Sequence, residues 1–177
     1  DAIAKGLQPL ADWIVKCPKS GDVMHEAQKY VKDDVTDVKE ALQGAKDIIA
    51  EMVSDDAKLR WKVKDSIYNY GRIVTKEKKK HEDEAKVYQM YYDYNERVNT
   101  IANHRIMAID RAEKEKVITV TFTYNVEYQV TYAFNRFTNK RMTIVSDVLT
   151  EAITDGYKRL LLPSVEREVR AELSERA

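Results

Sequence analysis

The sequence has little of several residue types that mark particular classes of protein. Cys17 is the only cysteine in the 177 residues, so no disulfide can form within the chain, and no close Cys or His spacing suits a structural zinc site. Five glycines and three prolines are few helix breakers, which favours long helices over a β-sandwich or a disordered chain. No apolar run approaches the roughly 20 residues that a membrane span needs, and no signal peptide opens the chain. We therefore expect a cytoplasmic protein that binds no membrane, metal or cofactor.

The charges of the sequence balance. Thirty Lys and Arg residues stand against thirty Asp and Glu residues, which gives a formal net charge of zero at pH 7. No global field draws such a chain to nucleic acid or to a membrane surface, so binding of either kind needs a local patch. The chain lacks an initiator Met and stops inside a charged helical pattern, and we expect it to be a piece of a longer protein.

The clearest pattern is a helical pair over residues 36–71. Its first helix has an apolar stripe at positions i, i+3, i+4 and i+7 and their repeats. The stripe consists of Val38, Ala41, Leu42, Ala45, Ile48, Ile49, Met52 and Val53. Thr36 or Asp37 can cap this helix, and Glu40 stands three residues after Asp37, which is the spacing of a capping box. The second helix follows residues 54–56, with Leu59, Val63, Ile67 and Tyr70 on its inner side, and Gly71 ends it.

Four more helices are predicted by apolar spacing and by helix-capping signals. The first begins near Gln8 and ends before Pro18, and the second is capped by Asp22 and runs to about Val31. A third covers 101–111. The last begins at Thr143 or Ser146 and continues to the end of the chain, where Pro163 either kinks it or opens a fresh helix.

The middle of the chain changes period. Residues 117–124 alternate β-branched and aromatic side chains with threonines, which indicates a strand. Residues 126–137 fit both a strand and a helix, and we favour a helix because Asn125 alone is too short for a hairpin turn. Residues 73–84 are highly charged and suggest a loop with a frayed helical end, and 85–94 suggest a helix. One strand needs a partner, which we expect in another part of a longer protein.

These patterns predict a mainly α fold, a multi-helix bundle with one short β-strand or small β element near residues 117–124. The candidate catalytic residues are few. His25 and His81 lie in polar surroundings typical of the surface, and His104 opens a short helix, where capping or packing is favoured over a ligand contact. Carboxylates fall in register with Lys and Arg on helix faces, and no phosphate loop or nucleophile motif is present. We expect no enzyme activity.

One local basic run stands out. Its members are Arg72, Lys76, Lys78, Lys79 and Lys80. With Glu77 the net charge over 72–80 is +4, and residues 82–84 reduce it to +1. A solvated loop is the favoured interpretation, and a phosphate contact is the alternative. Arg105 is a second candidate, while Tyr88, Tyr91 and Tyr92 are expected in the core before they are expected to stack on bases.

Several segments taken together resemble the bacterial Tex family of transcription accessory proteins. They are GLQPLAD at 6–12, ALQGAKDIIAE at 41–51, YYDY at 91–94, HRIMAIDR at 104–111 and GYKRLLLPSVERE at 156–168. The similarity covers nearly the whole chain except 125–143. Asn103 and Ala112 depart from the Ser and Gly that the family tends to have, which affects local turns only.

The resemblance implies a division into residues 1–100, a Tex-like N-terminal helical region, and residues 101–177, a central helical region with a short β element. In that family a YqgF/RNase H-like domain, helix-hairpin-helix elements and an OB-fold RNA-binding domain follow. The resemblance therefore implies a helical scaffold that positions RNA- or DNA-binding domains of the same chain. The alternative is a protein-interaction module that docks on RNA polymerase or the ribosome. For direct contact with nucleic acid we expect Arg72, Lys76, Lys78, Lys79 and Lys80, with Arg105 as the second choice.

Overall fold

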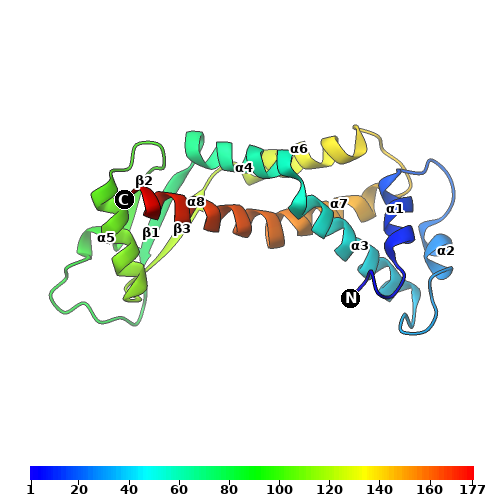
Figure 1. Cartoon of the computed structure of the whole chain (residues 1–177), viewed down its shortest axis with the longest axis horizontal. Helices are drawn as coiled ribbons and strands as arrows, with labels where there is room; N and C mark the ends of the chain where they lie inside the picture. The colour runs from blue at the N-terminus through cyan, green and yellow to red at the C-terminus, as the bar shows by residue number, and fades with distance from the viewer. The chain divides into compact units, whose positions relative to one another are not determined.

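The computed structural model describes all residues, 1–177, and the chain divides into two compact units. Unit 1 consists of Asp1–Arg60 and Val126–Pro163, and unit 2 consists of Trp61–Asn125 and Ser164–Ala177. Most residues are helical and one small antiparallel sheet is present, which confirms the predicted mainly α fold with a small β element (Figure 1). The division at residue 100 concerned regions of a longer protein, and it stays a prediction.

Unit 1 is built around α3 (Val38–Asp55). This helix contacts α1 (Gln8–Val15), α2 (Val23–Gln28), α7 (Ser146–Asp155) and a π-helical segment, Gly156–Leu161. The helix α6 (Val126–Thr138) packs on α7. The predicted helix over 126–137 is therefore confirmed, and its buried residues Gln129 and Ala133 have helical rather than strand spacing.

The start of α3 follows from its capping residues. The Asp37 carboxylate accepts a hydrogen bond from the Glu40 backbone N–H at 2.7 Å, and the Glu40 carboxylate accepts one from the Thr36 N–H at 3.2 Å. Hydrogen bonds from Thr36 lower the pKa of Glu40, because they favour its charged form. These reciprocal bonds satisfy backbone donors that the first turn leaves free. The predicted capping pair is confirmed, and Thr36 is the residue that donates to Glu40.

A close approach between two helices fixes the core of unit 1. Gly156 lies so near α3 that an added Cβ would stand 2.8 Å from the Ala50 carbonyl oxygen. Next to it, Tyr157 is completely buried, and its hydroxyl donates to Gln129 Oε1 at 3.4 Å. Burial raises the pKa of Tyr157 far above its ordinary value, since the charged form loses its hydration. The π-helical segment thus begins at a residue without a side chain because a helix backbone occupies that space.

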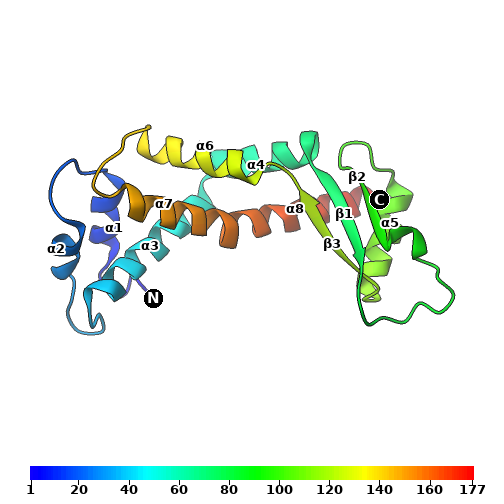
Figure 2. The same ribbon diagram turned by 180° about the vertical axis from the view of Figure 1, so that it is seen from behind.

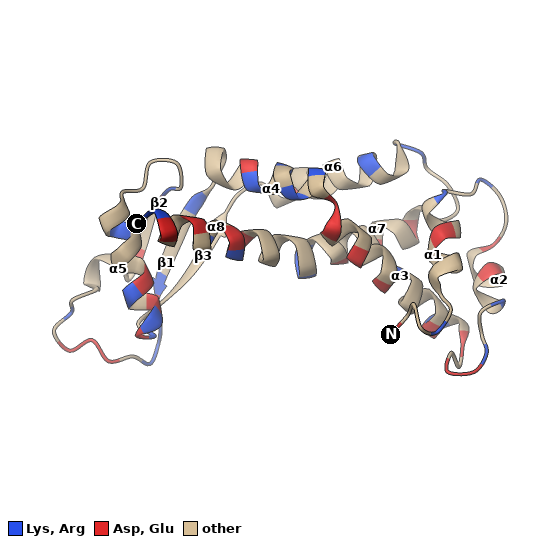
Figure 3. Cartoon of the chain, viewed as in Figure 1, with Lys and Arg blue, Asp and Glu red and all other residues tan.

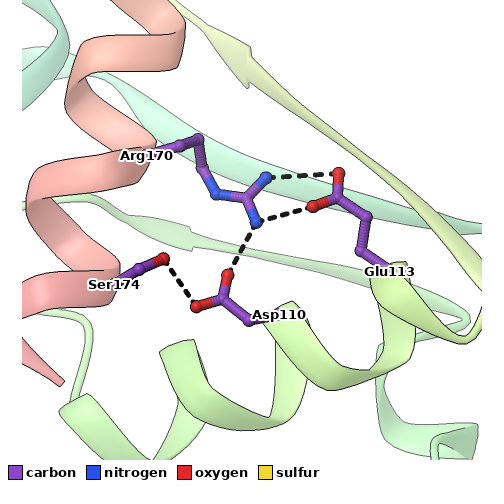
Figure 4. A network of polar contacts seen from close by, with 4 residues as sticks. All are labelled: Asp110, Glu113, Arg170 and Ser174. Carbon is purple, nitrogen blue, oxygen red and sulfur yellow. Dashed lines mark hydrogen bonds and ion pairs between the residues drawn. The ribbon is translucent and has the colours of Figure 1, made fainter.

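Unit 2 combines a three-stranded sheet with helices. The chain enters it along α4 (Ala57–Tyr70), which ends at Gly71 as predicted, although Tyr70 is 77 % exposed and does not belong to the inner side. The other helices are α5 (Asn103–Lys114) and, from Ser164 on, α8 (Leu162–Arg176), in which Pro163 is the second residue and follows the π-helical segment without a break in the helix. Arg170 of α8 bonds to Asp110 and Glu113 of α5, and Ser174 donates to Asp110 (Figure 4).

The sheet corrects three predictions. The loop predicted over 73–84 is wrong for its first part, which forms β1 (Arg72–Glu77), while 78–84 are irregular as predicted, and 85–94 are not a helix. They form a short 3₁₀ turn, Gln89–Tyr91, that leads into β2 (Asp93–Arg97). The predicted strand is β3 (Ile118–Thr123), and its partner lies in this chain rather than outside it. The strand order is β2-β1-β3 with both pairs antiparallel.

Side chains alternate between two faces of this sheet. One face has Ile73 and Thr75 of β1, with Ile118 and Phe122 of β3, and all four are buried. Figures 1 and 2 show α5 and the end of α8 on one side of the strands, in front of them in one view and behind them in the other. We call the opposite side the open face. It consists of Arg72, Val74, Lys76, Asp93, Asn95, Arg97, Thr119, Thr121 and Thr123, all exposed except the half-buried Val74.

Candidate nucleic-acid interface

Two of the predicted cations lie on the open face. Arg72 and Lys76 stand four residues apart on the central strand β1, and Ile73 and Thr75 between them point to the other side. The Arg72 Nε atom donates to Asn95 Oδ1 at 2.7 Å, and the Lys76 ammonium forms an ion pair with Asp93. Both partners belong to β2 on the same face. The strand therefore presents its cations to solvent on one side of the sheet.

Sequence reasoning missed a third cation on this face. Arg97 of β2 pairs directly with Arg72 in the strand register, and its Nη2 atom donates to the Asn69 carbonyl oxygen at 3.3 Å. Because 85–94 was interpreted as a helix, the sheet position of Arg97 was hidden. The available signal was the alternation of Asp93, Asn95 and Arg97, which are all exposed.

The three lysines after β1 form a short connected group. The backbone N–H of Lys78 donates to the Val117 carbonyl at 2.9 Å, so this residue continues the pairing of β1 with the segment before β3. Lys78 is half-buried, while Lys79 and Lys80 are exposed. In Figure 3 the basic residues, in blue, lie along β1 and at the start of the segment that follows it, and acidic residues, in red, come further along that segment.

Of the acidic residues that follow, Asp83 has a structural role. The Asp83 carboxylate accepts hydrogen bonds from the Tyr92 hydroxyl at 2.7 Å and from the backbone N–H groups of Val87 and Tyr88 at 2.9 and 3.1 Å. The hydrogen bond from Tyr92 is the main cause that lowers the pKa of Asp83, and it also raises the pKa of Tyr92 to about 12. Asp83 therefore closes the turn that leads to β2. Glu82 and Glu84 remain exposed.

Arg105 is not brought to the open face. It lies on α5, with its guanidinium carbon 5.5 Å from the centre of the Tyr94 ring and its Nε atom 3.8 Å from Glu96. Tyr94 and Glu96 alternate with the open-face residues of β2, so Arg105 lies on the other side of the sheet. Its stacking on Tyr94 and its ion pair with Glu96 give Arg105 a structural role on that side of the sheet.

The tyrosines and histidines near this region have mixed outcomes. Tyr88 and Tyr91 are buried, which confirms their predicted place in the core. His25 is exposed as predicted, but His81 is not a free surface residue, because its side chain is 15 % exposed and its Nε2 atom lies 2.6 Å from Glu77 Oε2. His104 is exposed, and the α5 cap residue is Ala102, so its predicted capping or packing role is wrong.

A groove in unit 1 has the opposite charge. It has a volume of about 900 Å³, and its lining includes six acidic side chains, most of them from α3 and α7, together with Lys46 and Arg159. The acidic residues are Asp1, Asp47, Glu51, Asp55, Glu151 and Asp155. Such a surface repels phosphate. No group of three or more His, Cys, Asp or Glu side chains in the chain is arranged to hold a metal ion.

The geometry so far defines a helical region with a small sheet whose open face and following segment carry cations. A family model described as Tex central region-like matches residues 19–177. The chain therefore belongs to the Tex family. No helix has both the length and the apolar character that a membrane span requires.

Relatives from several organisms agree with this assignment. Protein YdcI of Bacillus subtilis (strain 168) is 37 % identical over 99 % of this chain and 25 % of its own length. The transcriptional accessory protein Tex of Neisseria gonorrhoeae is 34 % identical over 67 % of this chain and 16 % of its own length. A more distant relative, S1 RNA-binding domain-containing protein 1 of Pongo abelii, is 26 % identical over 82 % of this chain and 16 % of its own length. The chain thus spans a quarter or less of the length of these relatives.

Proposed function

We propose that this chain is a scaffold region of a cytoplasmic transcription accessory protein that binds nucleic acid. In this proposal it positions RNA- or DNA-binding domains of a longer chain and adds phosphate contacts of its own. The family assignment supports the scaffold role, and the names of two relatives, one for transcription and one for RNA binding, support the connection to nucleic acid. The mechanism is binding and positioning, without covalent chemistry.

The observation that carries the contact role is the continuous series of cations along β1 and after it. Arg72 and Lys76 lie on the open face, and Lys79 and Lys80 are exposed directly after the strand. Lysine and arginine that neutralise phosphates release condensed counterions, which makes the binding depend on salt. Because the net charge of the chain is zero, we expect weak binding that needs low salt.

The test is a fluorescence anisotropy titration of the chain with labelled single-stranded RNA and with labelled duplex DNA. Each titration is repeated from low to physiological salt, for the unaltered chain and for a variant in which Lys76, Lys78, Lys79 and Lys80 are changed to Glu. A matched control changes Lys16, Lys19, Lys32 and Lys39 to Glu, four exposed lysines of unit 1. Both variants have the same net charge, so they separate a local surface from a global charge effect.

We expect the first variant to lose binding and the control to retain most of it. Equal losses in both variants would show a non-specific charge effect and contradict the local surface. No binding by the unaltered chain even at low salt would leave a scaffold whose partners are proteins.

A protein-interaction module is the second candidate, and exposed apolar side chains in unit 2 favour it. Val87, Met90 and Met107 are 70 %, 53 % and 51 % exposed. Large exposed apolar side chains are typical of protein-binding surfaces when they form one patch. This alternative predicts salt-insensitive binding to purified RNA polymerase or ribosomes, and a loss of that binding when Met90 and Met107 are changed to Ser.

A further inference from the structure

The open face contains two arginines that oppose each other directly. Arg72 of β1 and Arg97 of β2 are register partners, so both side chains leave the same face from neighbouring strands. Strands lie about 4.8 Å apart, and like charges placed directly opposite destabilise a sheet. The fold therefore keeps an arrangement that lowers its own stability at this position.

Neighbouring side chains do not neutralise this pair. Arg72 donates to the neutral side chain of Asn95, and Arg97 donates to the neutral backbone carbonyl of Asn69. By contrast, the lysine of the same face has a carboxylate partner, since Lys76 is paired with Asp93. The uncompensated charge of the open face is thus concentrated at the end that holds the two arginines.

The third strand extends this row with a hydroxyl group. Thr123 of β3 is the register partner of Arg72 on the other side, so Arg97, Arg72 and Thr123 form one row across all three strands. All three are exposed. Guanidinium groups bind phosphate oxygens through two parallel N–H donors, and threonine hydroxyls are frequent phosphate ligands.

The composition of the open face also indicates how a nucleic acid would be recognised. None of its nine residues is aromatic, whereas sheets that bind single-stranded RNA by its bases stack them on aromatic side chains. We infer that the row Arg97–Arg72–Thr123 binds the phosphate backbone of a nucleic acid without reading its bases. This inference rests on the proposed function, and it adds Arg97 and Thr123 to Arg72 of the cation series.

The test compares two double variants of the whole chain. Arg72→Gln with Arg97→Gln removes both charges of the row and keeps amide donors for Asn95 and Asn69. Arg111→Gln with Arg167→Gln is the matched control, because both residues are exposed arginines on helices of unit 2. Anisotropy titrations with labelled duplex DNA and with labelled RNA of two unrelated sequences, over a series of salt concentrations, give the affinity and its salt dependence.

We expect the row variant to bind about tenfold more weakly to every probe, and the slope of log affinity against log salt to fall by about 2. The control should change affinity by less than about twofold, as exposed isolated charges do. The row variant should also unfold at an equal or higher temperature than the unaltered chain, because the opposed charges are gone. An unfolding temperature that is not lowered would show that weaker binding comes from lost contacts with the nucleic acid and not from a less stable fold.

An unchanged affinity and salt slope in the row variant would overturn this inference. If the lysine variant of the previous section then lost binding, the proposed function would stand without this row. A loss that depended strongly on the base sequence of the probe would also contradict backbone binding. No binding by the unaltered chain at low salt would overturn both the row and the lysine series.

Discussion

The two units use their polar residues in different ways. In unit 1, helices cover one another, Tyr157 and Gln129 meet in the core, and a groove beside α3 and α7 is acidic. In unit 2, helices cover only one face of a sheet, and the other face keeps cations exposed, two of them opposed. A net charge of zero therefore conceals a local separation of charge. The zero net charge therefore does not exclude contact with nucleic acid. Such contact depends on which face of the sheet the charged side chains of each strand lie on.

The largest effect is expected from a substitution at the close contact between Gly156 and α3 in unit 1. Gly156→Ala adds a Cβ 2.8 Å from the Ala50 carbonyl oxygen. Because this oxygen belongs to the backbone of α3, one of the two helices must shift to accommodate the methyl group. We expect the free energy of unfolding of this unit to fall by about 2–3 kcal/mol, as for an overpacked core. Urea unfolding followed by circular dichroism measures it.

The control for that substitution is a second helical glycine of the same unit. A Cβ at Gly44 would stand 2.2 Å from the Leu7 Cδ1 atom, which is the far end of a side chain and not a backbone atom. Gly44→Ala also gains helix propensity, so we expect a net change within about 1 kcal/mol. A larger loss at Gly44 than at Gly156 would contradict the role given to the close approach.

A smaller effect is expected at the ionic network of unit 2. Arg170 bridges Asp110 at 2.7 Å and Glu113 at 2.9 Å, and its side chain is 18 % exposed (Figure 4). Arg170→Met keeps the length of the side chain but leaves two carboxylates near each other without their cation. We expect a loss of about 2 kcal/mol, less than for a fully buried pair because the carboxylates reach solvent.

An exposed arginine of unit 1 gives the matched comparison. Arg159 pairs with Asp155 four residues earlier at 2.8 Å, and its side chain is 53 % exposed. Arg159→Met should cost less than about 0.5 kcal/mol, since water screens the pair. Equal losses at Arg159 and Arg170 would indicate that the network of unit 2 adds nothing beyond an ordinary surface pair.

The smallest effect concerns the turn before β2 and its dependence on pH. Asp83 has a pKa below its ordinary value of 3.8, chiefly through the hydrogen bond from Tyr92. A lowered pKa in the folded state means that the stabilisation is present above 3.8 and is lost as the pH falls through the folded-state pKa. In an NMR titration, the amide signals of Val87 and Tyr88 should therefore move with a midpoint below 3.8. The same movement in Asp83→Asn would show that another group causes it.

The helices could be predicted where apolar residues repeat along one face. The stripe of α3, the Asp37 cap and the start of α1 near Gln8 all depend on neighbours within a few residues, and all are confirmed. The strand β3 was also predicted, because its threonines alternate with Ile118, Val120 and Phe122 and no charge interrupts them. Local patterns of this kind need no knowledge of the tertiary fold.

The other two strands could not be recognised from their residues alone. At Thr75 a buried position of β1 is occupied by a hydroxyl residue, which donates to the Tyr91 carbonyl at 2.7 Å and so hides the apolar alternation. In β2 the covered side holds Tyr94 and Glu96, which bond to each other, and no aliphatic residue marks it. The pairing of β1 with β3 joins segments far apart in the sequence. The position of Arg97 beside Arg72 followed from the pairing of β1 with β2 and was therefore missed.

The measurement that tests the central claim most directly is an NMR titration of the isotope-labelled chain with short duplex DNA at low salt. The central claim is that nucleic acid contacts the open face and the lysines after β1, and not the acidic groove of unit 1. We predict that amide signals of β1, β3 and Lys78–Lys80 shift with added DNA, while those of α3 and α7 stay in place. Shifts confined to α3 and α7, or no shift at all, would contradict the claim.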